Sequence, residues 1–209
     1  ASRHVESIHE FELETISYSG IWLDIKKRYA QALCWQDVRF YDWESLPIKA
    51  KGLEIIKASY PGKARKMLKK LVEVYIKEDD AMDKIHMMNQ EFIDEWKTAI
   101  PDDICPTSSC RNYDKYVWDD KNLRLASGTP LVVRGAATYN YTRMKYNLPA
   151  EPIYGGKVRY YYCKDHTKDK RVMVFNPNNY QSWMDEYAPI DRRAMYEKWV
   201  MDPMNRILT

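Results

Sequence analysis

The hydrophobic pattern of this chain changes its period near Pro61. Before that residue, positions 11–18 alternate apolar and polar side chains, which is typical of a strand with one buried face. After it, apolar side chains from Ala64 to Tyr75 recur at helical spacing and form the stripe of an amphipathic helix. Because Pro is well tolerated in the first turn of a helix, the helix is expected to begin there. The sequence therefore predicts an α+β fold, in which a small antiparallel sheet precedes a mainly helical region with a small β element.

Strands and tight turns are expected ahead of Pro61. Residues 11–18 and 21–33 are predicted to form a hairpin, with Ser19-Gly20 as its turn. A third strand is expected near 48–56, where Gly52 indicates a bulge or a close approach of another backbone segment. Residues 1–10 have the pattern of the end of a helix.

Helices dominate the pattern after Pro61. The expected elements are a helix from 61, a helix capped by Asp79 or Asp80, a helix over 130–147, strands over 158–163 and 171–175, and a closing helix over 189–208. Residues 101–129 are rich in turn-forming side chains, and so long a connection is expected either to carry function or to pack as a lobe.

Charge and cysteine content exclude several classes of protein. Among 209 residues, 33 Lys and Arg against 30 Asp and Glu leave a net charge of +3, so any basic surface must be local. Seven glycines and 17 tyrosines argue against Gly-rich phosphate loops and against disorder. Cys105 and Cys110 have a spacing compatible with metal binding, but no second pair completes a site, so reduced thiols are expected. No run of residues is apolar enough to span a membrane.

The predicted strand over 21–33 carries its charges in the middle. Side chains on a strand alternate faces, so Lys27 and Tyr29 would share one face while Lys26 and Arg28 share the other. Lys and Tyr donate hydrogen bonds that suit the minor groove of a duplex, where every base pair offers an acceptor whatever its sequence. An edge strand that carries charges to discourage aggregation is the alternative explanation.

Cations also gather at the start of the helix that follows Pro61. Lys63, Arg65 and Lys66 lie at the positive end of its dipole, where cations are unfavourable unless an anion binds. A phosphate at this position could be bound by the free backbone N–H groups and by the lysines. A solvated basic face is the alternative.

A second basic face is expected on the helix over 130–147. Its members fall at helical steps: Arg134, Thr138, Tyr141 and Lys145. An Arg with neighbouring hydroxyls suits a nucleic-acid backbone, although an ordinary surface helix explains the same face. Further basic residues of interest are Lys157, Lys170, Arg171 and Lys198.

Several short motifs occur in a fixed order along the chain: Lys26-Lys27-Arg28-Tyr29-Ala30, Lys51-Gly52-Leu53-Glu54, Ser59-Tyr60-Pro61, and Arg134-Gly135 with Thr138-Tyr139-Asn140. Their order and approximate spacing resemble the C-terminal part of family B DNA polymerases, and most closely the T-even-type bacteriophage replicative enzymes. The resemblance runs from about residue 11 to about residue 205. It implies that residues 1–56 form the C-terminal edge of a palm domain and residues 57–209 a thumb.

The resemblance also implies roles for single residues. Lys27 and Tyr29 are expected to contact the primer end in the minor groove, and Lys51, Gly52 and Glu54 to form the junction between palm and thumb. We expect the DNA backbone to be contacted by Lys26, Arg28, Ser59, Lys63, Lys66, Arg134, Thr138, Lys170, Arg171 and Lys198.

The catalytic carboxylates of that family are absent from this sequence. Family B enzymes supply them from an Asp-x-x-Ser-Leu-Tyr-Pro segment and a Tyr-x-Asp-Thr-Asp segment, neither of which occurs here. We therefore expect no catalytic residue, metal or cofactor in this chain, no activity by the chain alone, and Mg²⁺ in an assembled polymerase. The expected partners are primer–template DNA and a larger polymerase chain that carries exonuclease, fingers and palm carboxylates.

The remaining expectations concern location and alternatives. The chain would act in the cytoplasm of a bacterial host as a phage-encoded subunit or fragment, without a membrane partner. It ends at Ile207-Leu208-Thr209 without the hydrophobic tail that binds a sliding clamp, so clamp contact stays open. One alternative is a stand-alone, non-catalytic nucleic-acid-binding or assembly protein. Another is a metal-dependent phosphotransferase built on Asp119-Asp120.

Overall fold

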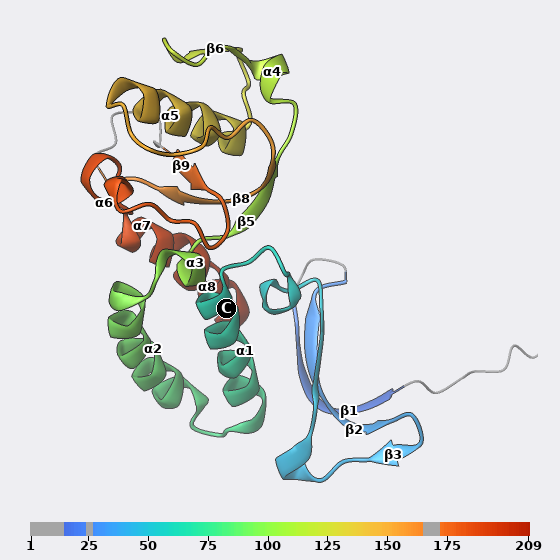
Figure 1. Cartoon of the computed structure of the whole chain (residues 1–209). Helices are drawn as coiled ribbons and strands as arrows, with labels where there is room; N and C mark the ends of the chain where they lie inside the picture. The colour runs from blue at the N-terminus through green and yellow to red at the C-terminus, as the bar shows by residue number, and fades with distance from the viewer. Residues whose placement is uncertain (1–14, 24–26, 165–171) are drawn as a thin grey trace, which may run out of the picture.

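A computed structural model gives the fold and describes residues 15–23, 27–164 and 172–209. Two sheet-containing regions flank a group of helices (Figure 1), which confirms the predicted α+β class. The helix expected over 1–10 lies outside the described residues, as do Lys26, Lys170 and Arg171.

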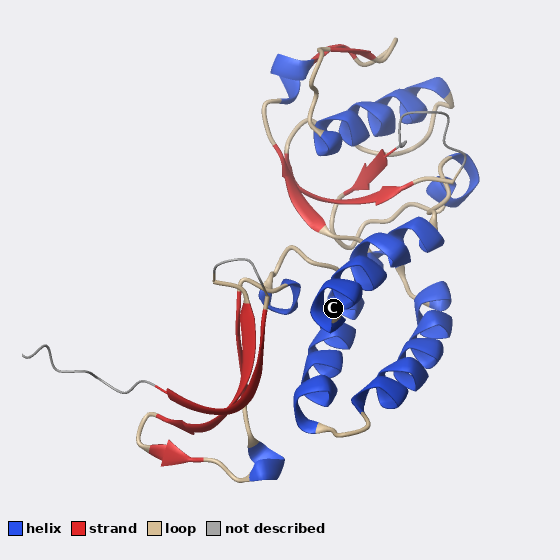
Figure 2. Cartoon of the chain, turned by 180° about the vertical axis from the view of Figure 1, so that it is seen from behind, coloured by secondary structure: helices blue, strands red, loops and turns tan. Residues whose placement is uncertain are grey.

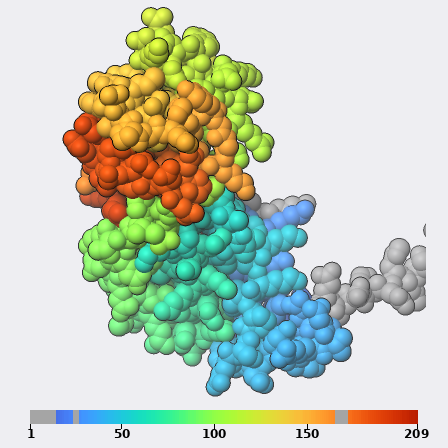
Figure 3. Space-filling view, in the orientation of Figure 1, coloured from blue at the N-terminus to red at the C-terminus, as the bar shows by residue number. Residues whose placement is uncertain are grey.

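The first sheet contains β1 (Thr15–Trp22), β2 (Tyr29–Gln36), β3 (Arg39–Phe40) and β4 (Ile48–Lys51). All pairs are antiparallel, and β2 lies between β1 and β4 while β3 pairs with its far end. One face packs on the helices through Ala30 and Ala32, which are fully buried. Figure 3 shows that this sheet lies to one side of the helical part.

The hairpin reverses at a different place from the one predicted. Trp22 pairs with Tyr29, and the Leu23 N–H donates to the Arg28 carbonyl at 3.1 Å, so the chain turns there and not at Ser19-Gly20. Gly20 lies inside β1, where a Cβ would come within 2.7 Å of the Trp22 ring. The single strand predicted over 21–33 is therefore wrong, because the ladder ends at the pair Trp22 and Tyr29, and Lys27 and Arg28 lie outside it.

Two central helices follow the predicted pattern closely, and a short third one lies in the stretch predicted to be rich in turns. They are α1 (Gly62–Lys77), α2 (Ala81–Thr98) and the short α3 (Pro101–Ile104). The buried stripe of α1 contains Ala64, Leu68 and Leu71, as its periodicity predicts. Asp80 occupies the N-cap position of α2, but its carboxylate pairs with Lys84 at 3.1 Å and makes no side-chain capping bond.

The end of the chain packs back on these helices. It contains α7 (Arg192–Tyr196), a π-helical turn η3 (Glu197–Met201) and α8 (Asp202–Leu208), of which η3 and α8 contact α1. Met195 and Val200 are fully buried, as predicted for this closing helix. The Trp96 indole N–H donates to the Arg192 carbonyl at 2.9 Å, which fixes α2 against α7.

The second sheet has the order β5 (Thr107–Cys110), β8 (Gly156–Tyr162) and β9 (Val172–Phe175). Helix α5 (Leu131–Lys145) lies across it and packs most closely on β9, as the reverse view shows (Figure 2). Gly135 permits this approach, since a Cβ there would lie 2.8 Å from Val174. Around these elements lie α4 (Tyr113–Tyr116), β6 (Val117–Asp119), β7 (Arg124–Leu125) and α6 (Trp183–Tyr187). Residues 101–129 thus contain regular elements, of which α3 contacts α1 and β5 joins the second sheet.

The segment after β4 lies against the hairpin turn. The third strand predicted over 48–56 ends at Lys51, and Gly52 follows with φ +70° before the 3-10 turn η2 (Glu54–Ile56). A Cβ on Gly52 would lie 2.5 Å from the Lys27 carbonyl oxygen and 2.9 Å from Arg28 Cγ. The sequence allowed either a plain bulge or a close backbone approach at Gly52, and the structure shows the close approach.

A pair of Gly→Ala variants separates the two demands on Gly52. Gly128 has a similar φ of +74° but nothing within 4 Å of its Cβ position. Gly128→Ala should cost about 1–2 kcal/mol, because only the left-handed backbone is unfavourable. Gly52→Ala should cost about 1–3 kcal/mol more, because it also clashes with the Lys27 backbone. Urea denaturation of both variants measures the difference, and equal losses would show that the approach to Lys27 is unimportant.

Candidate nucleic-acid interface

Glu54 is the centre of an ion cluster between the first sheet and the helices. Its Oε1 accepts from Arg28 Nη2 at 2.6 Å and lies 3.5 Å from Arg206 Nη2 and 3.6 Å from Lys57 Nζ. Only 7% of Glu54 is exposed. Burial by itself would raise the pKa of Glu54, but a backbone hydrogen bond and the charges of Arg28 and Lys57 outweigh it and hold the pKa below its usual range.

This cluster joins two motifs that lie apart in the sequence. Gly52 contacts the backbone of Lys27, and Glu54 holds the side chain of Arg28. The guanidinium of Arg28, a residue expected to contact the DNA backbone, is mostly buried on Glu54. Lys51 is exposed at the end of β4.

Lys27 and Tyr29 are close in space, but not for the predicted reason. Lys27 is exposed in the turn with φ +67°, outside the strand, so strand alternation does not set its direction. Tyr29 begins β2 and lies in one cross-strand row with Trp22 and Lys51. Because directly paired residues share a face, these three side chains form an aromatic and basic end on the face of the sheet opposite Ala30.

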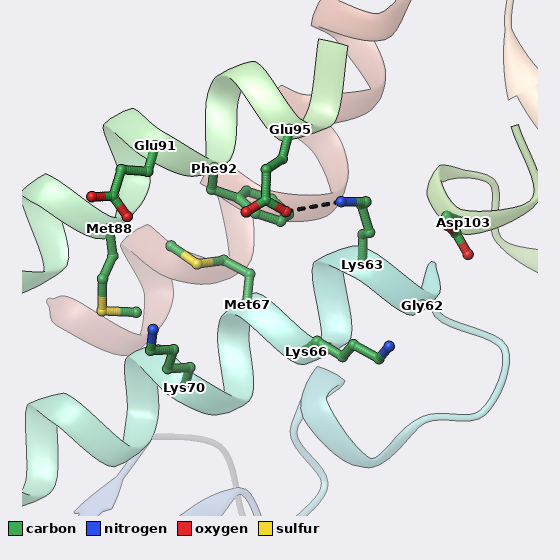
Figure 4. A pocket seen from close by; sticks show the side chains of 10 residues that line it. All are labelled: Gly62, Lys63, Lys66, Met67, Lys70, Met88, Glu91, Phe92, Glu95 and Asp103. Atoms are coloured by element: carbon green, nitrogen blue, oxygen red, sulfur yellow. Dashed lines mark hydrogen bonds and ion pairs between the residues drawn. The ribbon is translucent and has the colours of Figure 1, made fainter. Parts of the chain in front are cut away.

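Lys63 and Lys66, at the start of α1, line a groove between α1 and α2 (Figure 4). Its volume is about 380 Å³, and its floor is apolar, with Met67, Met88 and Phe92. Lys63 pairs with Glu95 at 2.8 Å, and this hydrogen bond lowers the pKa of Glu95. The other charged lining residues are Lys66, Lys70, Glu91 and Asp103. Carboxylates therefore balance the lysines here, which disfavours a polyanion in this groove, although Lys66 itself is exposed.

A second groove, which we call the hydroxyl groove, has a different lining. It is about 630 Å³ in volume, and its lining residues are Ala58, Ser59, Thr107, Ser108, Ser109, Arg111 and Lys157. No Asp or Glu is among these lining residues. The Thr107 N–H donates to the Ser59 carbonyl at 2.9 Å, which joins the segment before α1 to β5. Ser109 pairs with Lys157 across β5 and β8.

The sequence indicated only part of this groove. Ser59 was expected to contact DNA and Lys157 was noted as basic, whereas Thr107, Ser108, Ser109 and Arg111 were not singled out. Their signal is a run of hydroxyl residues followed by an Arg, without an intervening acid. A smaller hollow shares Ser108, Ser109 and Arg111 and continues to the start of α5 at Leu131.

Two polar side chains of α5, Thr138 and Asn140, form hydrogen bonds within the protein. Thr138 is 7% exposed and donates to the Arg134 carbonyl at 3.0 Å, so its hydroxyl is already bonded within the helix, and its expected contact with the DNA backbone stays a prediction. Asn140 is fully buried and exchanges hydrogen bonds with the backbone of Ile153 at 2.8 and 2.9 Å. Arg134 is half-buried on the same helix.

Other candidate residues are placed more simply. Lys198 is exposed in η3 and lies 3.5 Å from Asp202. The Asp119 carboxylate accepts from the backbone N–H groups of Lys121 and Asn122, and so closes the turn between β6 and β7. Within the described ranges, no three His, Cys, Asp or Glu side chains are grouped for a metal ion. Helices long and apolar enough to cross a membrane are also absent from the described part.

Comparisons with known proteins agree with this architecture. No family model matches the sequence, and neither does any curated protein. Among solved structures, the chain is similar to the family B DNA polymerase from the hyperthermophilic archaeon Pyrobaculum calidifontis, with a TM-score of 0.57 and 17% identity. The match covers 94% of this chain and 22% of that one. The likeness shows the fold, and this chain spans less than a quarter of that polymerase.

The charge on Glu54 should make stability depend on acid pH. Its pKa is lower in the folded chain than the value of about 4.3 in an unfolded one, so its contribution is present above that pH and is lost as the pH falls. Glu54→Gln should cost about 1–3 kcal/mol at pH 7 and should flatten the acid limb of the stability curve. The groups that face it are Arg28, Lys57, Tyr60 and Arg206.

Urea denaturation between pH 3 and pH 7 measures this dependence. The control is Glu44→Gln, because Glu44 is exposed in the 3-10 turn over 43–45, and this change should stay within about 0.5 kcal/mol at pH 7. Parallel curves for Glu54→Gln and the parent would contradict the assignment.

Proposed function

We propose that this chain is the palm-edge and thumb part of a family B DNA polymerase of the T-even bacteriophage type, and that it holds primer–template duplex. The ordered motifs of the sequence and the fold similarity to a family B DNA polymerase support this proposal. In it, residues 1–56 close the palm and residues 57–209 form the thumb. The protein would act in the cytoplasm of a bacterial host.

The hydroxyl groove carries the proposal. A nucleic-acid backbone presents anionic phosphates whose oxygens only accept hydrogen bonds. Ser and Thr hydroxyls can donate to these oxygens, and Arg111 and Lys157 add positive charge without a lining carboxylate to neutralise it. The groove between α1 and α2 lacks this property, because its lysines lie among Glu91, Glu95 and Asp103. We therefore place the backbone-binding track on β5 and the segment before α1.

The end of the first sheet suits the duplex terminus. Lys27 is exposed and Tyr29 is half-buried beside Trp22 and Lys51. With Arg28 engaged by Glu54, Lys27 and Tyr29 are the described motif side chains that can reach minor-groove acceptors. A mispaired terminus displaces those acceptors, so contacts of this kind favour a correct pair.

Nucleotidyl transfer in this family uses the carboxylates of two motifs that this sequence lacks. The proposal therefore includes a larger polymerase chain with Mg²⁺-binding acids. Within the described residues, β1 pairs only with β2, which leaves its other edge open. Tyr18 and Trp22 on this strand are 65% and 63% exposed. An open edge with exposed aromatic side chains suits a strand added from the larger chain.

Duplex binding should depend steeply on salt and little on sequence. Arg111→Ala and Lys157→Ala should each weaken affinity about tenfold and reduce the slope of log affinity against log salt by about 1. Fluorescence anisotropy with two duplexes of different sequence, between 50 and 300 mM NaCl, measures both effects. The control is Arg193→Ala on α7, which removes an 89% exposed guanidinium that pairs with Glu197. Affinity that is insensitive to salt would refute backbone binding.

Nucleotide incorporation should require both chains. In primer extension with Mg²⁺ and deoxynucleotides, this chain alone should incorporate nothing, and activity should appear when the larger chain is added. In the assembled enzyme, Lys27→Ala should slow extension of matched ends and reduce the penalty for extending a mismatch. Incorporation by this chain alone, free of contaminating partner, would overturn the proposal, and purification without any larger chain would favour a stand-alone binding protein.

A further inference from the structure

One buried carboxylate oxygen links parts of the chain that are far apart in sequence. Glu54 Oε1 accepts from Arg28 in the hairpin turn and from Arg206 in α8, which is 152 residues further along the chain. Beside them, the buried ring of Tyr60 packs edge-on against Trp199 at 5.0 Å between ring centroids. The turn of the first sheet and the end of the chain therefore meet at a single anionic group.

The same turn carries Lys27. On one side, the Leu23 N–H donates to the Arg28 carbonyl at 3.1 Å. On the other, Gly52 leaves no room for a Cβ next to the Lys27 carbonyl oxygen. Arg28 is tied to Glu54 at 2.6 Å. The backbone that follows the exposed Lys27 side chain is thus held by Gly52 and Glu54, outside the β1–β2 ladder.

Among the three ion pairs of Glu54, those with Arg28 and Arg206 differ in strength. The ion pair with Arg28 is short, at 2.6 Å, and only 17% of the Arg28 side chain is exposed. Loss of Arg28 would therefore leave the buried charge of Glu54 without its main partner. The ion pair with Arg206 is longer, at 3.5 Å, and 49% of the Arg206 side chain is exposed, so this pair contributes little to stability. Removal of the Arg206 side chain therefore takes one of three cations from Glu54 without unfolding the protein.

We propose that Glu54 and Arg206 are positioning residues, through which the C-terminal helix α8 sets the position of Lys27 at the duplex end. The inference rests on the proposed function, because it assigns Lys27 to the duplex terminus. Neither Glu54 nor Arg206 contacts DNA in this scheme. Their effect on binding passes through Arg28 and the turn.

A double-mutant cycle between Arg206 and Lys27 tests the scheme. The probe is a primer–template duplex with a recessed 3′ end, and the readout is its dissociation constant at fixed salt. Arg206→Ala and Lys27→Ala should each weaken binding about fivefold, and the double variant should be little weaker than Lys27→Ala alone. Arg193→Ala should leave the effect of Lys27→Ala unchanged. Fully additive losses would show that Arg206 binds DNA directly, and would overturn the inference.

Amide hydrogen exchange gives a readout that does not depend on DNA. Exchange at the Leu23 N–H should quicken in Arg206→Ala and Glu54→Gln, because the turn loosens, whereas the Thr107 N–H, bonded to Ser59, should be unaffected. Unchanged exchange at Leu23 would overturn the positioning role, whatever the binding data show. A parent chain that binds no duplex, combined with faster exchange at Leu23, would instead refute the proposed function and leave only the structural link.

Discussion

The buried charge of Glu54 is the interaction on which the arrangement of this molecule depends. A carboxylate with so little exposed surface must be paired, and its partners come from the hairpin turn, from the segment before α1 and from the last helix. The same few residues therefore set how the first sheet meets the helices. Gly52 completes the junction, because only a residue without a Cβ fits against Lys27 there.

Ion pairing also determines which cations are available to bind an anionic ligand. The chain carries nearly as many acids as bases, so a lysine is available to an anion only where the fold keeps carboxylates away. Lys63 has Glu95 and Arg28 has Glu54, which removes two of the cations that helix and strand patterns favoured. Arg111 and Lys157 line a groove of hydroxyl groups instead. In the proposed function, the binding surface therefore lies on β5 and β8 and not at the start of α1.

The proposed division of labour follows from these two constraints. In this proposal, the hydroxyl groove would provide sequence-independent contacts to a backbone, whereas the sheet end near Lys27 and Tyr29 would read whether the terminal pair is regular. The cluster around Glu54 lies between the β2 end of the sheet and α8. A contact that checks a base pair needs a fixed position, and an ion pair network supplies it more firmly than an isolated hairpin turn.

Local periodicity in the sequence determined the α+β class, the helices α1, α2 and α5, and the strands β8 and β9 to within a few residues, because apolar spacing reports which face is buried. Short motifs in the sequence also pointed to Lys27, Gly52 and Ser59, the last only through the resemblance to family B DNA polymerases. Only the tertiary structure decided that the hairpin turns at Lys27, that Thr138 is buried, and that Glu54 neutralises Arg28. The physical reason is that ion pairs and grooves depend on distances between residues such as Glu54 and Arg206, 152 positions apart, and no local pattern encodes those distances.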